Sequence, residues 1–267
     1  DPLWVQYLNY LNNLLHGNLG VSTNYYPTPV IDIIAQDIKW TLFLLTVSVV
    51  LSFAFGTLIG IFMAWRRGSA LDSSLSSLMT FFYSILYPWL ALLAVYVLGY
   101  TLGWFPFSDG YDLSLTPGWS FDFIMSAAYH SILPALTIIV STMAGWMLTM
   151  RNSMITTLSE DYVLLARAKG LTSRRVMFSY AARNAILPSV TGLAIAIGAV
   201  VGGQLLVEKV FSYPGIGFAL FQAIQSQDYA LADGILLLVI VATVIMNLIV
   251  EALYVLLDPR MRQERSA

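Results

Sequence analysis

Five long apolar runs constrain this chain more than any other feature of its sequence. About 20 apolar residues suffice for a helix to cross the hydrocarbon core of a bilayer. Each run meets that length, and only 10% of the residues are charged, against roughly 25% in soluble domains. We therefore predict an all-α membrane protein, a polytopic helical bundle with five visible spans. The runs are Trp40–Trp65, Leu75–Leu102, Ala127–Met150, Ala185–Val207 and Leu231–Leu257.

The basic residues predict the orientation of these spans. Eleven of the 13 Lys and Arg residues follow the first, third or fifth run, and loops rich in Lys and Arg stay on the cytoplasmic side. The loop 103–122 holds three Asp and no basic residue, so we expect it outside. The amino end is then outside and the carboxyl end cytoplasmic. An outside start without a signal peptide predicts a further span before residue 1, six in all.

The chain divides into three parts by composition. Residues 1–39 are polar and aromatic, and Trp4, Tyr7 and Leu8 recur at helical spacing, which predicts an extracytoplasmic amphipathic segment lying on a surface. Residues 40–257 form the predicted transmembrane domain, with a cytoplasmic loop at 151–185, and residues 258–267 form a cytoplasmic tail. Three prolines inside the apolar runs each remove a backbone donor and predict helix breaks: Pro88, Pro134 and Pro188.

Several chemistries find no support in the sequence. The chain has no cysteine and only two histidines, His16 and His130, too few for a typical metal site. It has no Gly-x-x-x-x-Gly-Lys-Ser/Thr motif, so it cannot hold ATP phosphates in a P-loop. Ser120 lacks the glycine spacing of a hydrolase nucleophile. We therefore predict neither an enzyme nor a metal site, and any ATP-driven step needs a nucleotide bound by a partner.

The most polar stretch between two apolar runs is Glu160–Pro188. Glu160 and Asp161 suit a helix start, with Asp161 as the cap. Lys169 and Gly170 suit a helix end. Ala166 and Ala168 are small enough for another surface to approach closely. The alternative is a solvated basic loop that only sets topology.

This stretch resembles the cytoplasmic signature loop of ABC importer permeases, often called the EAA loop. The sequence DYVLLARAKG at 161–170 is followed by Ile186-Leu187-Pro188. Ala166 and Gly170 match the pattern, whereas Leu164 and Leu165 replace its Glu and Ala. The form DYV..ARAKGL looks like the branch for dipeptides, oligopeptides and nickel. Other segments resemble that branch in order along nearly the whole chain: HGNLGVS, WRRGSALD, LGWFP, ILPALT, VEKVFSYPGIG and LLDPRMR.

The resemblance implies a transmembrane permease subunit of an ATP-driven importer, forming a pathway for peptides in a prokaryotic inner membrane. It implies a second homologous permease, two ATPase subunits that bind ATP and Mg, an extracytoplasmic substrate-binding protein and membrane lipid, but no nucleic acid. The chain itself is expected to bind no cofactor. The loop is expected to form a coupling helix that docks on an ATPase. The implied coupling residues are Glu160, Asp161, Tyr162, Ala166, Arg167, Ala168, Lys169, Gly170 and Leu171.

A second group of residues is a candidate for the pathway or its outer gate. Gln204 and Glu208 lie four residues apart at the outer end of the fourth run, so they share a helix face. A lining role and a packing role are both open for them. The turn Tyr213-Pro214-Gly215 follows, and outer loops of the family contribute to the gate. Asn247 and Glu251 share a face of the last run, and the alternative for Glu251 is an ion pair with a cytoplasmic Arg.

Other functions remain open at the level of sequence. The same machinery carries nickel or oligosaccharides in permeases that resemble this one. An ATP-independent channel or ion-coupled transporter would need charges or broken helices inside the membrane, and the interiors of the first three runs hold no charged residue. A third alternative is a membrane scaffold whose basic loop binds a soluble partner without transport.

Overall fold

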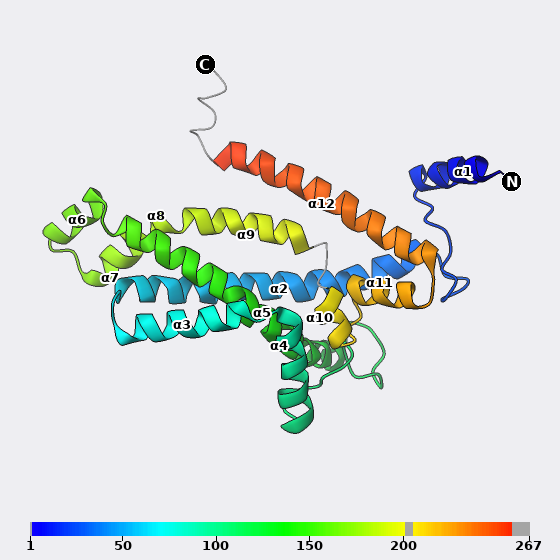
Figure 1. Cartoon of the computed structure of the whole chain (residues 1–267), viewed down its shortest axis with the longest axis horizontal. Coiled ribbons are helices and arrows are strands. Elements are labelled where there is room, and N and C mark those ends of the chain that lie inside the picture. The colour runs from blue at the N-terminus through cyan, green and yellow to red at the C-terminus, as the bar shows by residue number, and fades with distance from the viewer. Residues whose placement is uncertain (1, 201–204, 258–267) are drawn as a thin grey trace, which may run out of the picture.

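The computed structural model describes residues 2–200 and 205–257. Most of the described residues are helical. Val21 and Pro29 form an isolated antiparallel β-bridge. Figure 1 shows an elongated molecule with α6 at one end and α10 and α11 toward the other. The α-helices are α1 (Leu3–Leu15), α2 (Val30–Trp65), α3 (Ala70–Ser84), α4 (Tyr87–Ala94), α5 (Phe121–Thr157), α6 (Asp161–Ala168), α7 (Ser173–Arg175), α8 (Arg183–Ala185), α9 (Leu187–Ala199), α10 (Leu205–Val210), α11 (Ile216–Gln225) and α12 (Tyr229–Leu257). Two π-helices, η1 (Val95–Thr101) and η2 (Val176–Ala182), complete the set.

Helices α2 and α5 form the axis of the molecule, because they lie against each other along much of their length (Figure 1). Gly56 and Gly60 allow this approach. A Cβ atom added at Gly60 would lie 2.5 Å from the Met147 carbonyl oxygen, and one at Gly56 would lie 2.7 Å from that of Met143. The spacing Gly-x-x-x-Gly is a known signal for close helix contact in membranes. Our sequence analysis did not single it out.

Three helices are long and apolar enough to span a membrane: α2, α5 and the 229–249 part of α12. Two further candidates are bent pairs of helices, so the described residues hold up to five spans. The predicted class, an all-α polytopic membrane protein, is confirmed. The predicted run 75–102 is not a continuous helix, and the run 185–207 begins at a bend of 50° between Ala185 and Leu187.

The three prolines explain where helices break and where they do not. Helix α3 ends at Ser84, four residues before Pro88, and α4 leaves at an angle of 96°, because a proline ring clashes with the carbonyl of residue i−4. Pro188 similarly lies just inside α9, after a 50° bend. Pro134, however, lies inside the continuous helix α5, so the prediction of a break there is wrong.

The amino-terminal segment differs from the predicted division. Helix α1 forms as expected, and its Trp4, Tyr7 and Leu8 side chains are exposed. Helix α2 begins at Val30 rather than at Trp40, so the predicted boundary between residues 39 and 40 lies inside a helix. Pro29 precedes α2 with extended backbone angles, which fits a proline immediately before a helix start. The predicted tail, 258–267, lies outside the described residues.

Asp228 ties the amino-terminal loop to the start of α12. Its carboxylate accepts hydrogen bonds from the Ser22 hydroxyl, from the Asn24 N–H at 3.1 Å and from the Leu231 N–H at 3.2 Å. Burial alone would raise the pKa of Asp228, but these hydrogen bonds outweigh it and hold the pKa below its usual value. Asp228 is fully buried, so a charged group fixes this junction.

Candidate functional site

The predicted coupling helix is present as α6. It begins at Asp161 and ends at Ala168, and Glu160 occupies the N-cap position without a side-chain capping hydrogen bond. The expectation that Asp161 caps the helix is therefore wrong, because Asp161 is the first helical residue. Its charge, together with that of Glu160, still lies at the positive end of the helix dipole.

Gly170 ends α6 through a Schellman motif. Its backbone has φ of +74°, a left-handed conformation that glycine adopts without steric cost. The Gly170 N–H donates to the Arg167 carbonyl at 2.9 Å and the Leu171 N–H donates to the Ala166 carbonyl at 3.4 Å. These two bonds define the motif. Lys169 lies at the C-cap, as the sequence predicts.

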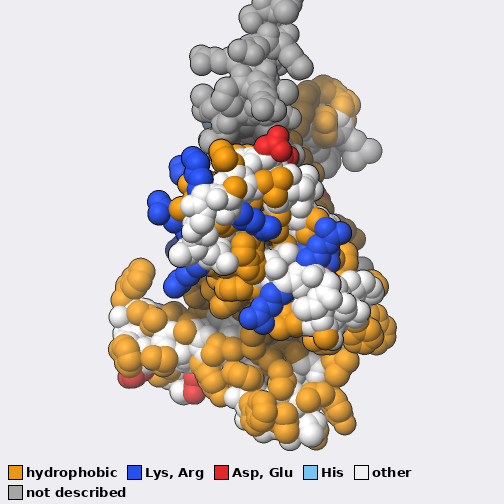
Figure 2. All heavy atoms as spheres, turned by 90° about the vertical axis from the view of Figure 1, so that its left-hand side faces the viewer, with side chains coloured by type: hydrophobic (Ala, Val, Ile, Leu, Met, Phe, Trp, Pro, Cys, Tyr) orange, Lys and Arg blue, Asp and Glu red, His pale blue; other side chains and the backbone are white. Residues whose placement is uncertain are grey.

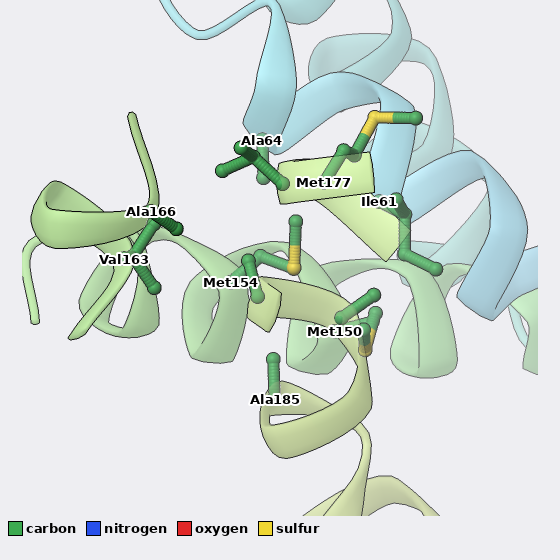
Figure 3. Packing of buried hydrophobic residues seen from close by; sticks show 11 residues of the cluster. Ile61, Ala64, Met150, Met154, Val163, Ala166, Met177 and Ala185 are labelled. Atoms are coloured by element: carbon green, nitrogen blue, oxygen red, sulfur yellow. The ribbon is translucent and has the colours of Figure 1, made fainter. Parts of the chain in front are cut away.

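One face of α6 packs on the spans of its own chain. Val163 and Ala166 are buried in a cluster with Ile61 of α2 and with Met150 and Met154 of α5. In Figure 3, Val163 and Ala166 lie on the side of α6 that faces Met154. The small size of Ala166 therefore serves packing within the chain, which corrects the expectation that it admits a partner surface. Ala168 is exposed and remains available for such contact.

The opposite face of α6 is apolar and open. Tyr162, Leu164 and Leu165 are 38%, 49% and 55% exposed. The Tyr162 hydroxyl accepts a hydrogen bond from the Asn184 side-chain amide at 2.9 Å, which orients the ring. Large apolar side chains that project from a short helix outside the candidate spans favour contact with another protein.

Basic residues surround this face. Figure 2 views the α6 end of the molecule and shows Lys and Arg side chains gathered over it. The Arg167 guanidinium lies 5.3 Å from the centroid of the Trp65 ring, a cation–π distance. Arg167, Trp65 and Leu171 also line a cavity of about 510 Å³. The exposed basic residues at this end are Arg66, Arg67, Arg167, Lys169, Arg174, Arg175 and Arg183.

An ion pair beside this site was missed at the sequence level. The Arg151 guanidinium donates to both carboxylate oxygens of Asp72, at 2.7 and 2.9 Å. Asp72 also accepts from the Gly68 N–H, while the Ser69 hydroxyl caps α3 by accepting from the Asp72 N–H. The pattern Ser-x-x-Asp is a capping signal that could have pointed to Asp72. Its partner Arg151 could not have been found, because 79 residues separate the two.

Glu208 lies toward the other end of the molecule and caps α11. Its carboxylate accepts from the Gly217 N–H at 2.7 Å, the Phe218 N–H at 3.2 Å and the Thr41 hydroxyl at 2.9 Å. Thr41 in turn accepts from the Ile216 N–H at 2.8 Å. Three of the four N–H groups that a helix start leaves unpaired are therefore satisfied. Glu208 is fully buried, so in this conformation it holds α11 rather than lining an open pathway.

The predicted turn at residues 213–215 surrounds this carboxylate. Tyr213 is buried, its hydroxyl lies 3.0 Å from the Ser131 hydroxyl, and burial raises its pKa to about 12. A Cβ atom added at Gly215 would lie 2.5 Å from the Thr41 hydroxyl and against Glu208. Pro214 packs beside Gly110 of the loop before α5. The structure therefore brings Glu208, Tyr213, Pro214 and Gly215 together.

The remaining pathway candidates do not join this group in the described structure. Asn247 is exposed on α12. Gln204 lies outside the described residues, as does the side chain of Glu251. Among the described residues, no group of three or more His, Cys, Asp or Glu side chains is placed to hold a metal ion.

These observations define the class of the protein. The chain is a polytopic helical membrane protein with a short, exposed helix packed on the ends of its spans. Residues 56–263 match the family described as binding-protein-dependent transport system inner membrane component. The chain belongs to this family.

Curated relatives cover nearly all of the chain. It is 35% identical over 262 residues to an oligopeptide transport system permease protein of Bacillus subtilis, an alignment that covers 97% of this chain and 81% of the relative. It is 35% identical over 286 residues to a di/tripeptide transport system permease protein of Pseudomonas aeruginosa, covering 99% and 82%. It is 33% identical over 280 residues to a dipeptide transport system permease protein of Escherichia coli, covering 99% and 82%.

Proposed function

We propose that this chain is the transmembrane permease subunit of an ATP-driven ABC importer for short peptides. The geometry of α6 carries the proposal, because this helix is anchored to the spans by one face and exposed on the other. The relatives are named for oligopeptide, di/tripeptide and dipeptide transport, which supports peptides as the cargo. The chain catalyses no bond change. ATP and Mg are bound by partner ATPases.

The packing of α6 suggests how force reaches the pathway. Val163 and Ala166 belong to the same buried cluster as residues of α2, α5 and η2. Protein interiors are close-packed and transmit displacement. When the ATPases close on ATP, α6 is displaced, and the ends of α2 and α5 move with it. The spans then change from inward-open to outward-open, and hydrolysis resets them.

The partners and the membrane orientation complete the proposal. A second homologous permease would pair with this chain, and two ATPases would dock on the two coupling helices. A substrate-binding protein would deliver the peptide on the opposite side. In the proposed orientation that end lies in the cytoplasm of a prokaryotic cell, which the basic residues around α6 support through the positive-inside rule.

Recovery of the complex tests this proposal. The wild-type chain, purified from its native membrane in mild detergent, should bring with it a P-loop ATPase and a second permease, identified by mass spectrometry. Leu165→Asp should greatly reduce ATPase recovery, because burying a charge at the centre of an interface costs about 2 kcal/mol or more.

Leu113→Asp is the matched control. Leu113 is 74% exposed in the loop before α5, so this variant should retain the ATPase. If both variants recover the ATPase as well as the wild type does, α6 is not its docking site. Recovery of the wild-type chain alone, as an oligomer that conducts solutes without ATP, would contradict the importer itself.

A further inference from the structure

Two neighbouring cavities lie beside α11, where α10, the loop 24–28 and the start of α2 meet. Their volumes are about 320 and 490 Å³, within the range of roughly 300–1,000 Å³ typical of small-molecule sites. Tyr25 and Gln222 line both cavities. The Tyr25 hydroxyl donates to the Gln222 side-chain oxygen at 2.7 Å, so this pair forms a shared wall.

The smaller cavity contains a carboxylate with no partner. Asp37 lines it and is partly buried, and its side chain makes no hydrogen bond or ion pair with any described residue. The buried Glu208 carboxylate repels it electrostatically. A partly buried charge without a partner is costly. A cation or a hydrogen-bond donor in this cavity would stabilise the Asp37 carboxylate.

The larger cavity is lined by Lys209, whose ammonium group lies over two aromatic rings. The Lys209 Nζ lies 4.2 Å from the centroid of the Phe221 ring and 5.6 Å from that of Phe218. Within residues 2–200 and 205–257, Lys209 has no ion-pair partner. Phe218 also lines the cavity of Asp37, so this ring borders the surroundings of both side chains.

The wall between the two charges offers neutral hydrogen-bonding groups. The Gln222 oxygen is occupied by Tyr25, so the Gln222 amide group can donate. A ligand that satisfies the whole arrangement needs an ammonium group at one end, a carbonyl between and a carboxylate at the other. An unmodified short peptide has these three features.

We propose that these cavities form a binding site for short peptides, in which Asp37 receives the amino terminus and Lys209 the carboxylate. The inference rests on the proposed function and specifies which residues of the permease itself select the cargo. It assigns to Gln222 a hydrogen bond to the peptide carbonyl.

Photolabelling of the assembled permease–ATPase complex, without substrate-binding protein, tests the site. The probe is a dipeptide with a diazirine side chain, and the competitors are dialanine, N-acetyl-dialanine and dialanine amide. The wild-type complex should be labelled on fragments that contain Tyr25 or α11. Dialanine should compete about tenfold better than either blocked analogue, the loss expected when one charge-assisted hydrogen bond is removed.

Each variant should lose one preference. In Asp37→Asn, the affinity for dialanine should fall by about tenfold. Dialanine and N-acetyl-dialanine should then compete equally well with the probe, while dialanine amide should still compete less well than dialanine. Lys209→Gln should show the opposite pattern. Asp32→Asn and Lys39→Gln change exposed charges on the same helix as Asp37 and should behave as the wild type does.

Two outcomes would overturn the inference and are distinguishable from failure of the proposed function. The inference is wrong if the probe labels other segments, or if all three peptides compete equally well in the wild type. The proposed function still stands in that case, provided that ATP-driven uptake in proteoliposomes is intact. If the variants weaken only the affinity for the substrate-binding protein, the charges serve docking and the inference is wrong. If the wild-type complex, supplied with the substrate-binding protein and ATP in proteoliposomes, takes up neither dialanine nor pentaalanine, both proposals fail.

Discussion

Three carboxylates with little or no access to solvent each have a full set of donors. Asp72, Glu208 and Asp228 are 3%, 0% and 0% exposed. Arg151 pairs with the first, backbone N–H groups and Thr41 surround the second, and Ser22 with backbone N–H groups surrounds the third. Burying a charge is costly unless it is paired and hydrogen-bonded, so each of these residues is committed to structure. Asp37, which lacks such donors, is the exception from which a binding role was inferred.

The first prediction concerns the cap of α11. Glu208→Ala should destabilise the protein by about 2–4 kcal/mol, because it leaves buried N–H groups of α11 without an acceptor. Thermal unfolding in detergent measures the change. Glu208→Gln retains one oxygen and should be milder. Equal stability of the wild type and the Ala variant would show that water replaces the carboxylate, and that the cap does not hold α11.

The second prediction concerns pH and Asp228. Its pKa is lowered in the folded protein, so its contribution to stability is complete above the unfolded pKa of about 3.9 and is lost as pH falls through the folded value. Asp228→Asn should therefore unfold at a lower temperature than the wild type by a constant difference from pH 8 to 5. Below about pH 4 the difference should shrink. A difference that grows on acidification would contradict this assignment.

At the scale of elements, α6 is a short helix whose two faces have different roles. Eight residues are too few for a helix to be stable alone in water. The Schellman motif at Gly170 fixes its end, and packing of Val163 and Ala166 fixes its position. Tertiary contacts therefore hold the helix in place. Because Val163 and Ala166 face the buried cluster, the opposite side of the helix is the exposed one.

A matched pair of substitutions tests this division of faces. Ala166→Leu should destabilise the protein by about 1–3 kcal/mol, because it overpacks the buried cluster. Ala168→Leu, on the exposed face, should leave the unfolding temperature unchanged. Both can be measured by thermal unfolding of the purified chain. If Ala168→Leu is as destabilising as Ala166→Leu, the two faces are wrongly assigned.

At the scale of the whole molecule, α2 and α5 connect the two proposed functional regions. The buried cluster under α6 includes Ile61 and Met150, and the other end of α2 contributes Thr41 to the cap of α11. The two helices are closely packed at Gly56 and Gly60, and close-packed interiors transmit displacement. In the proposed mechanism, a displacement of α6 reaches the region of Asp37 and Lys209 through this pair.

The proposed orientation gives a prediction at this scale. The chain has no cysteine, so a single introduced cysteine is the only reactive thiol it contains. Ser114→Cys, in the exposed loop before α5, should react with a membrane-impermeant maleimide on intact spheroplasts. Thr172→Cys, exposed beside α6, should react only after permeabilisation. The reverse pattern would place α6 outside and exclude an ATPase at that face.

The sequence by itself determined the class of the protein, the existence of α6 and its end at Gly170. These depend on local properties: apolar length, the conformational freedom of glycine and the charge near a helix end. It also indicated helix breaks at two prolines, Pro88 and Pro188. It could not tell that Pro134 stays within a helix, because that depends on the neighbours that satisfy the backbone.

Only the tertiary structure decided what the polar residues do. The pair Asp72–Arg151 and the pair Thr41–Glu208 join residues 79 and 167 positions apart, and no local pattern encodes such a meeting. The same holds for Ala166. A small side chain is compatible with contact to a partner or with packing inside its own chain, and only the tertiary structure shows that Ala166 is buried. Asp37 and Lys209 were unremarkable in the sequence. They became a candidate site because folding paired the other buried charges and left these two beside a shared cavity wall.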